Sequence, residues 1–239
     1  MVGVRIVSAV LLLAALGGCA LARSPEQPGL EVLSAAFDPE RTFAGDMRES
    51  SDDEFILTVW AAARDNYAPS YSLAIVYRCI PPAPPSEEWT CGYFARMLRT
   101  GTATEDGFGT GLALYGHARE APSASDMRLS LDRAELEWLE ADVAACPKGI
   151  FAMDSIRVAD WNPDIHYMLQ EREDRSLILH PAEIRVMMFG SYTRSTYQGW
   201  VLANGVPAAV RNLVETLEPC WKPATSPRPW RRSGDVWVE

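Results

Sequence analysis

Apolar and polar residues alternate along the first half of this chain in a way that predicts β-strands. Residues 55–60 form a run of β-favouring side chains, and a regular alternation follows at residues 71–79. The same period of two returns at residues 89–97. Strict alternation is typical of a strand with one buried face. We therefore expect three strands here, the second and third being partners in a hairpin.

The connection between those two partner strands is rich in proline. Residues 80–88 include four prolines, which cannot donate to a sheet ladder, so this segment is expected to be a stiff exposed loop. Cys79 and Cys91 lie at its two ends, on matching faces of the two strands. We expect them to form a disulfide, which would contribute about 3 kcal/mol in the chain-entropy model.

A period near 3.6 predicts a first helix that begins near Asp132. Asp132 with Glu135 three residues later has the pattern of a capping box. Pro147 and Gly149 would end the helix. The apolar stripe consists of Leu136, Leu139, Val143 and Cys146.

A second helix is expected to begin near Asn204, with Pro207 in its first turn, and to end at Pro219. Its apolar stripe consists of Val210, Leu213, Val214 and Leu217. Each predicted helix thus ends in a cysteine beside a proline, and each cysteine extends the buried stripe. Four structural cysteines allow three pairings, and this pattern favours Cys146 with Cys220.

Further short segments complete the fold prediction. A Gly-rich turn at residues 104–111 is followed by a strand through Leu112 and Leu114. Other β-like segments occupy residues 156–161, 165–169, 177–179, 184–189 and 197–202. The predicted fold class is α+β: a mainly antiparallel sheet with two helices packed on one side, stapled by two disulfides.

The first twenty residues have a different pattern. Arg5 is followed by an apolar run at residues 6–16, which is too short for a stable transmembrane helix. The sequence Leu16-Gly17-Gly18-Cys19 resembles the lipobox of bacterial lipoprotein signal peptides. The resemblance implies that Cys19 receives a diacylglyceryl group and becomes the first residue of the mature chain. The alternative is an ordinary secretory signal or a single membrane anchor.

This resemblance also implies a place and a domain organisation. Because residue 20 is Ala rather than Asp, the resemblance implies the outer membrane, with the protein facing the periplasm. We expect a signal peptide at residues 1–18 and a lipidated tether at 19–52, which contains a short helical piece near residues 30–37. A single α+β domain would follow at 53–221, and an irregular tail at 222–239. No family is identified from residues 21–239.

Charge limits the possible partners. The net charge is −10 at pH 7, which argues against nucleic acid and makes a basic envelope protein an electrostatically suitable partner. Tryptophans in the predicted elements are expected in the core: Trp60, Trp89, Trp138, Trp161 and Trp200. The tryptophans of the tail, Trp230 among them, either pack back onto the domain or form an interaction anchor.

No motif in the sequence specifies an enzyme. His117, His166 and His180 have no metal-ligand spacing and are expected at the surface, and no cofactor or metal is expected. No nucleophile elbow or CxxC pair occurs. The leading hypothesis is a non-catalytic binding lipoprotein, for example an inhibitor or immunity-type protein. The alternative is a periplasmic hydrolase whose carboxylates meet in space; its candidates are Asp160, Asp164, Glu171 and Asp174.

Overall fold

The computed structural model describes eight stretches of the chain, and the fold is built from these. They are residues 27–43, 54–62, 68–80, 89–101, 110–161, 182–190, 193–200 and 204–231. Cys19 and the predicted signal peptide lie outside them, as do the β-like segments 165–169 and 177–179 and most of the proline-rich loop.

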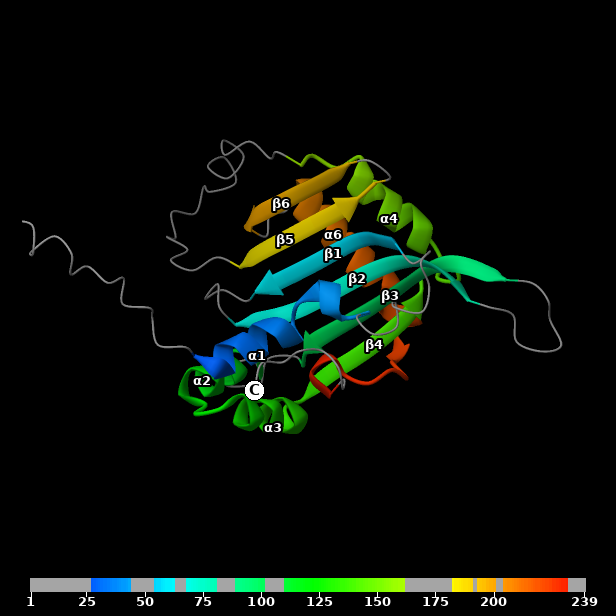
Figure 1. The fold of residues 1–239 in the computed structure, drawn as a ribbon. Helices are drawn as coiled ribbons and strands as arrows, with labels where there is room; N and C mark the ends of the chain where they lie inside the picture. Colours follow the sequence, from blue (N-terminus) through cyan, green and yellow to red (C-terminus); the bar gives the residue numbers. More distant parts are fainter. Residues whose placement is uncertain are drawn as a thin grey trace, which may run out of the picture.

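The described residues form one seven-stranded antiparallel sheet with helices on both faces (Figure 1), so the fold class is α+β. The strand order is β6-β5-β1-β2-β3-β4-β7. The strands are β1 (Glu54–Ala62), β2 (Pro69–Ile80), β3 (Thr90–Thr100), β4 (Leu136–Asp142), β5 (Glu183–Phe189), β6 (Arg194–Trp200) and β7 (Lys222–Pro223). The α-helices are α1 (Pro28–Ala36), α2 (Thr110–Glu120), α3 (Ala124–Arg133), α4 (Gly149–Arg157) and α6 (Gly205–Leu217). Three 3₁₀ turns complete the described elements: η1 (Pro39–Arg41), η2 (Glu218–Cys220) and η3 (Pro229–Arg231).

Helices α4 and α6 cover one face of the sheet. The buried stripe of α6 repeats at intervals of three and four residues, as an amphipathic helix requires. It consists of Val206, Val210, Leu213 and Leu217. These side chains pack in one core cluster with Leu57 and Val59 of β1 and with Ile184 and Val186 of β5. The helix predicted to begin near Asn204 is thus confirmed, and Val210, Leu213 and Leu217 of its predicted stripe are buried, while Val214 is partly buried.

Helices α1, α2 and α3 cover the other face over β2, β3 and β4. Their core contains Val32 and Leu33 of α1, Leu98 of β3 and Trp138 of β4. Trp230 of η3 is 3% exposed and belongs to the same cluster. The sheet therefore carries helices on both sides, not only on one as the sequence predicted.

Residues assigned from the sequence to the tether and the tail take part in this core. Helix α1 lies within residues 19–52, yet Val32, Leu33, Ala36 and Phe37 are all buried. Beyond residue 221, β7 pairs with β4, and the Trp138 indole N–H donates to the carbonyl of Ser226 at 2.9 Å. The packed unit thus includes residues on both sides of the 53–221 range.

The helix predicted from Asp132 to Cys146 is wrong. Helix α3 ends at Arg133, and β4 follows as a strand whose side chains are buried on both faces. Leu136 and Trp138 face the α1–α3 layer, while Leu139 and Ala141 face the α4–α6 layer. A strand covered on both faces loses simple alternation, and its apolar positions then imitate a helical stripe.

Two segments that the sequence predicted as strands belong to helices. The strand expected through Leu112 and Leu114 is α2, whose buried residues Gly111, Leu114 and Ala118 repeat at helical spacing. The strand expected at residues 156–161 is occupied by the end of α4 and the turn that follows it. Lys148, with φ of 62°, starts α4 directly after Pro147. The proline that was expected to end a helix therefore precedes one.

The strands predicted at 55–60, 71–79, 89–97 and 184–189 are confirmed as β1, β2, β3 and β5, and the segment at 197–202 overlaps β6. In β2, however, both faces are buried, because η1 and Phe43 cover Ala74 and Val76. Each helix in the described ranges is too short or too polar to span a bilayer.

Candidate functional site

The half of the sheet formed by β1, β5 and β6 has one apolar face and one mixed, largely polar face. The apolar face packs against α4 and α6. In Figure 1, α1 lies in front of the lower half of the sheet, below β1, while β5 and β6 have no described helix in front of them. The side chains on this open face are Thr58 and Trp60 of β1, Glu183, Arg185 and Met187 of β5, and Thr196 and Gln198 of β6.

A groove runs between this open face and the segment formed by α1 and η1. We call it the α1–β5 groove; its volume is about 990 Å³, at the upper end of the range typical of ligand sites. The half-buried side chains of Leu30 and Ala35 on α1, together with Tyr115 on α2, contribute apolar atoms to one wall. The groove is thus partly apolar along α1 and polar along β5 and β6.

A hydrogen-bonded network fixes Arg185 in the polar wall. The Nε atom of Arg185 donates to Oε1 of Glu183 at 3.1 Å, and Nε2 of Gln198 donates to the same oxygen at 3.0 Å. The guanidinium carbon lies 4.7 Å from the ring centroid of Trp60 on the neighbouring strand. This cation–π contact and the Glu183 carboxylate together orient the guanidinium.

Arg185 keeps its outer edge available for a ligand. Its side chain is 53% exposed, and its terminal nitrogens have no hydrogen bond to any described residue. A guanidinium with its stem oriented and its fork open matches the geometry of a carboxylate or a phosphate. This makes Arg185 the best candidate for a binding residue among the described side chains.

Thr58 provides a second unusual group at the floor of the groove. It is 1% exposed, and its hydroxyl has no hydrogen-bond partner among the described residues. A buried polar group without a partner costs about 1–3 kcal/mol, so a ligand atom that accepted this hydrogen bond would recover part of that cost. The flexible side chain of Met187 lies directly across from Thr58 on β5 and also lines the groove.

The two predicted disulfides are both present. Cys79 and Cys91 are direct cross-strand partners in β2 and β3, which accounts for their pairing. Cys146 is joined to Cys220, although Cys146 lies in the turn between β4 and α4 and not at the end of a helix. Cys19, the predicted lipidation residue, lies outside the described residues.

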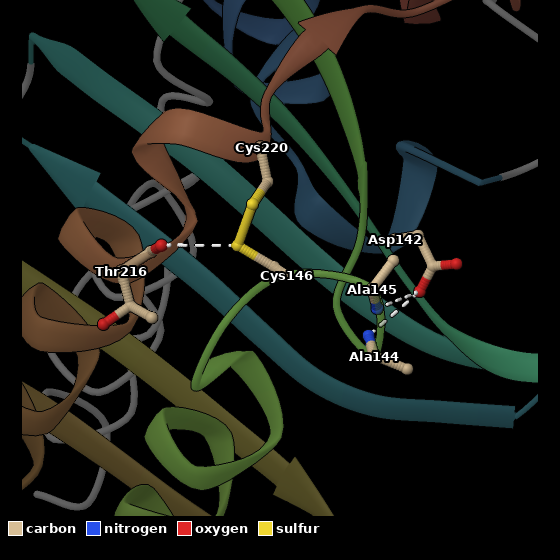
Figure 2. The surroundings of a disulfide bond; sticks show 6 residues. All are labelled: Asp142, Ala144, Ala145, Cys146, Thr216 and Cys220. Carbon is tan, nitrogen blue, oxygen red and sulfur yellow. Dashed lines mark hydrogen bonds between the residues drawn. A yellow bond between two sulfur atoms is a disulfide. The ribbon is translucent and has the colours of Figure 1, made fainter.

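The Cys146–Cys220 disulfide holds the two covering helices of one face together (Figure 2). It connects the turn before α4 with the end of α6, where Cys146 Sγ lies 3.4 Å from the carbonyl oxygen of Thr216. Asp142 shapes this turn, because its Oδ1 accepts hydrogen bonds from the backbone N–H groups of Ala144 and Ala145 at 2.9 and 3.1 Å. These contacts are structural and lie on the α4–α6 side of the sheet.

The residues proposed for catalysis do not assemble in the described part of the chain. Asp164, Glu171 and Asp174 lie outside it, and Asp160 is exposed beyond the end of α4. Across the described ranges, no group of three or more His, Cys, Asp or Glu side chains is placed to hold a metal ion. His117 is exposed on α2, as predicted, while His166 and His180 are not described. The hydrolase hypothesis remains a prediction.

The clear carboxyl pKa shifts belong to structural ion pairs. Hydrogen bonding from Arg231 lowers the pKa of Asp132, and hydrogen bonding from Arg99 lowers the pKa of Glu218. Burial raises the pKa of Tyr71 to about 12. A carboxyl group that acts as a general acid needs a raised pKa, and neither Asp132 nor Glu218 meets that requirement.

A second, smaller hollow contains Arg96, an arginine whose role is structural. It has a volume of about 530 Å³ beside the Cys146–Cys220 disulfide. Arg96 in its lining is only 8% exposed, its guanidinium lies 4.6 Å from the ring centroid of Phe43, and Nη1 donates to the carbonyl of Thr42 at 3.4 Å. The contrast with the half-exposed Arg185 supports the α1–β5 groove as the candidate site.

The sequence did not reveal this groove. Polar and apolar residues do alternate along β5, but only the fold shows that β5 pairs with β1, so that Arg185 meets Trp60. Of the tryptophans expected in the core, Trp138 is buried, as predicted, and Trp60 lines the groove. Trp89 is 62% exposed, so its prediction is wrong.

Three comparisons with known proteins were made: with family models, with curated sequences and with solved structures. None of them found a match to this chain.

Proposed function

We propose that this protein is a lipid-anchored binding protein of the bacterial cell envelope, with the α1–β5 groove as its binding site. Cys19 carries the lipid, and the domain faces the periplasm from the inner leaflet of the outer membrane. The observation that carries the proposal is the arrangement around Arg185, whose stem is fixed by Glu183 and Trp60 while its fork stays open to the groove.

A further observation supports the proposed compartment. The two disulfides suit an oxidising environment such as the periplasm.

The acidic charge favours a basic partner. With a net charge of −10, the protein suits an inhibitor or immunity-type role toward a basic envelope protein. Such a complex would weaken as salt rises, because exposed charges beyond about 8–10 Å are screened at physiological ionic strength. Binding that is unaffected by salt would argue against this form of the proposal.

The binding site is tested by placing a photocrosslinking amino acid at two positions of the full-length lipoprotein. Ser34 is exposed and lines the groove, whereas Phe151 is 76% exposed on α4, on the opposite face. Irradiation of cells should give a discrete adduct from position 34 that position 151 does not give. The proposal fails if both positions give the same adducts, or if neither gives any.

The anchor is tested separately with Cys19→Ser. This change should abolish metabolic labelling with radioactive palmitate and leave the precursor unprocessed. Labelling that persists in the variant would show that the lipobox interpretation is wrong.

A further inference from the structure

The groove lies close to the predicted lipid anchor. Cys19 and the first residue of α1, Pro28, are separated by nine residues along the chain, which span at most about 32 Å when fully extended. Helix α1 is itself fixed to the sheet through Val32, Leu33 and Phe37. Whatever the conformation of the connection, the wall of the groove begins within this distance of the bilayer. With the proposed anchor at Cys19, the groove is therefore near enough to the membrane surface to take a ligand from it.

The polar wall of the groove suits an anionic group. Arg185 offers two terminal nitrogens that make no hydrogen bond to the described residues, and such a fork binds carboxylate or phosphate oxygens in pairs. Because Trp60 lies against the face of the guanidinium, a ligand meets it along its edge. Thr58 supplies an unused hydroxyl at the floor.

The carboxylates of the lining are compatible with an anionic ligand. Glu183 is hydrogen-bonded to Arg185, and Asp38 is paired with Arg41 at 3.6 Å. Glu31, the remaining acidic residue of the lining, lies on the exposed side of α1. The two ion pairs are neutral overall, so Glu31 adds a single, solvent-screened negative charge.

The opposite wall suits a hydrocarbon chain. The half-buried side chains of Leu30 and Ala35 on α1 and Tyr115 on α2 line the groove, and Met187 lies on its floor. A volume of about 990 Å³ is much more than a small anion fills. The groove thus has the charged Arg185 side chain on one wall and apolar surface along the other. These two walls match the head group and the chain of an amphipathic molecule.

From these observations we infer that the α1–β5 groove binds a single-chain anionic lipid from the membrane, with its carboxylate or phosphate on Arg185 and its chain along α1. This inference rests on the proposed binding function and on the anchor at Cys19. A protein segment in the same groove is the competing outcome of the experiment.

The test uses the full-length lipoprotein in nanodiscs of phosphatidylcholine. Three probes of equal chain length carry a diazirine near the end of the chain: a fatty acid, an alkyl phosphate and an uncharged fatty alcohol. After irradiation, labelled peptides are mapped by mass spectrometry. The acid or the phosphate should label the α1 and β5 peptides, and their ratio identifies the head group. The alcohol should label these peptides at least about tenfold less, because it lacks the charge-assisted hydrogen bonds.

Variants assign the effect to Arg185. Arg185→Gln should reduce labelling by the charged probe at least about tenfold, and Arg185→Lys should retain part of it, because lysine keeps the charge but not the fork. The matched control is Arg157→Gln, since Arg157 is also half-exposed but lies on α4 beyond the opposite face. Thermal unfolding of each variant checks that the fold is retained.

Several results would overturn the inference. Equal labelling by the alcohol and the charged probes, or labelling that Arg185→Gln leaves unchanged, would exclude recognition of the head group. A protein adduct at position 34 without lipid labelling of the groove would support the proposed binding function and exclude a lipid as the ligand. If neither the adduct nor the lipid label is found, both the binding function and the lipid ligand are excluded.

Discussion

Replacement of Trp230 by alanine tests whether the C-terminal segment is part of the fold or a loosely attached tail. Trp230 is 3% exposed in the cluster formed with α1 and α3, and its indole N–H donates to Oδ1 of Asp132 at 2.9 Å. A tryptophan buries about 150–250 Å². At about 25 cal/mol per Å², this burial is worth roughly 4–6 kcal/mol.

The expected loss is smaller than this burial, because the segment can detach and regain conformational entropy. We expect Trp230→Ala to lower the free energy of unfolding by about 3 kcal/mol, at the low end for a buried tryptophan. With a urea m-value of about 2 kcal/mol per M, the midpoint should fall by about 1.5 M. Trp230→Phe, which keeps most of the packing and loses the N–H donor, should cost about 1 kcal/mol.

The assay is urea unfolding of the mature protein with its disulfides intact, followed by circular dichroism. Trp89→Ala is the matched control, since Trp89 is 62% exposed and its removal should change stability by no more than about 0.5 kcal/mol. If Trp230→Ala and Trp89→Ala have equal effects, the C-terminal segment contributes nothing to the fold and the reasoning is refuted.

The remaining predictions concern the pH dependence of the Asp132–Arg231 ion pair, the two disulfides and two glycines. Arg231 lowers the pKa of Asp132 below its usual 3.8, so the stabilisation is present above that pH and is lost as pH falls through the folded-state pKa. The difference in unfolding free energy between the wild type and Asp132→Asn should therefore stay constant from about pH 8 to 5 and shrink below about pH 4. A difference that is unchanged in acid would contradict this. Replacing both cysteines of the disulfide that closes 74 residues should cost about 4.5 kcal/mol, more than the roughly 3 kcal/mol for the disulfide that closes 12, as urea midpoints would show; the reverse order would contradict the chain-entropy argument. Gly116→Ala should stabilise α2 by up to about 1 kcal/mol in thermal unfolding, because an added Cβ meets nothing within 4 Å. Gly149→Ala should destabilise by about 1–3 kcal/mol or more, because its Cβ would lie 2.2 Å from the carbonyl oxygen of Val143, and equal effects of the two changes would refute the packing argument.

Short-range features of the fold were predictable because their causes lie close together in the sequence. The β2–β3 hairpin follows from two alternating runs joined by a proline-rich loop, and its register places Cys79 opposite Cys91. Helix α6 follows from one apolar stripe that begins after Asn204. In both cases the residues that decide the structure lie within about thirty positions of one another.

Features that depend on distant partners were not predictable. β4 was mistaken for a helix because helices on both sides bury its two faces, and local periodicity does not show which elements will pack there. The same limit applies to the groove. Trp60 and Arg185 become neighbours only when β5 pairs with β1, across more than a hundred residues of chain.

The division between sequence and tertiary structure therefore follows the range of the interactions. Residues 16–19 provide the resemblance that predicts the lipid anchor, and alternation and stripe patterns define the α+β class, the hairpin and α6, since each of these depends on neighbouring residues alone. Tertiary structure places α1 on the sheet, leaves the polar face of β5 and β6 uncovered by the described helices, and stacks Arg185 on Trp60. The groove between α1 and the strands β1, β5 and β6 exists only after the chain has brought these segments together, because no single segment contains both of its walls.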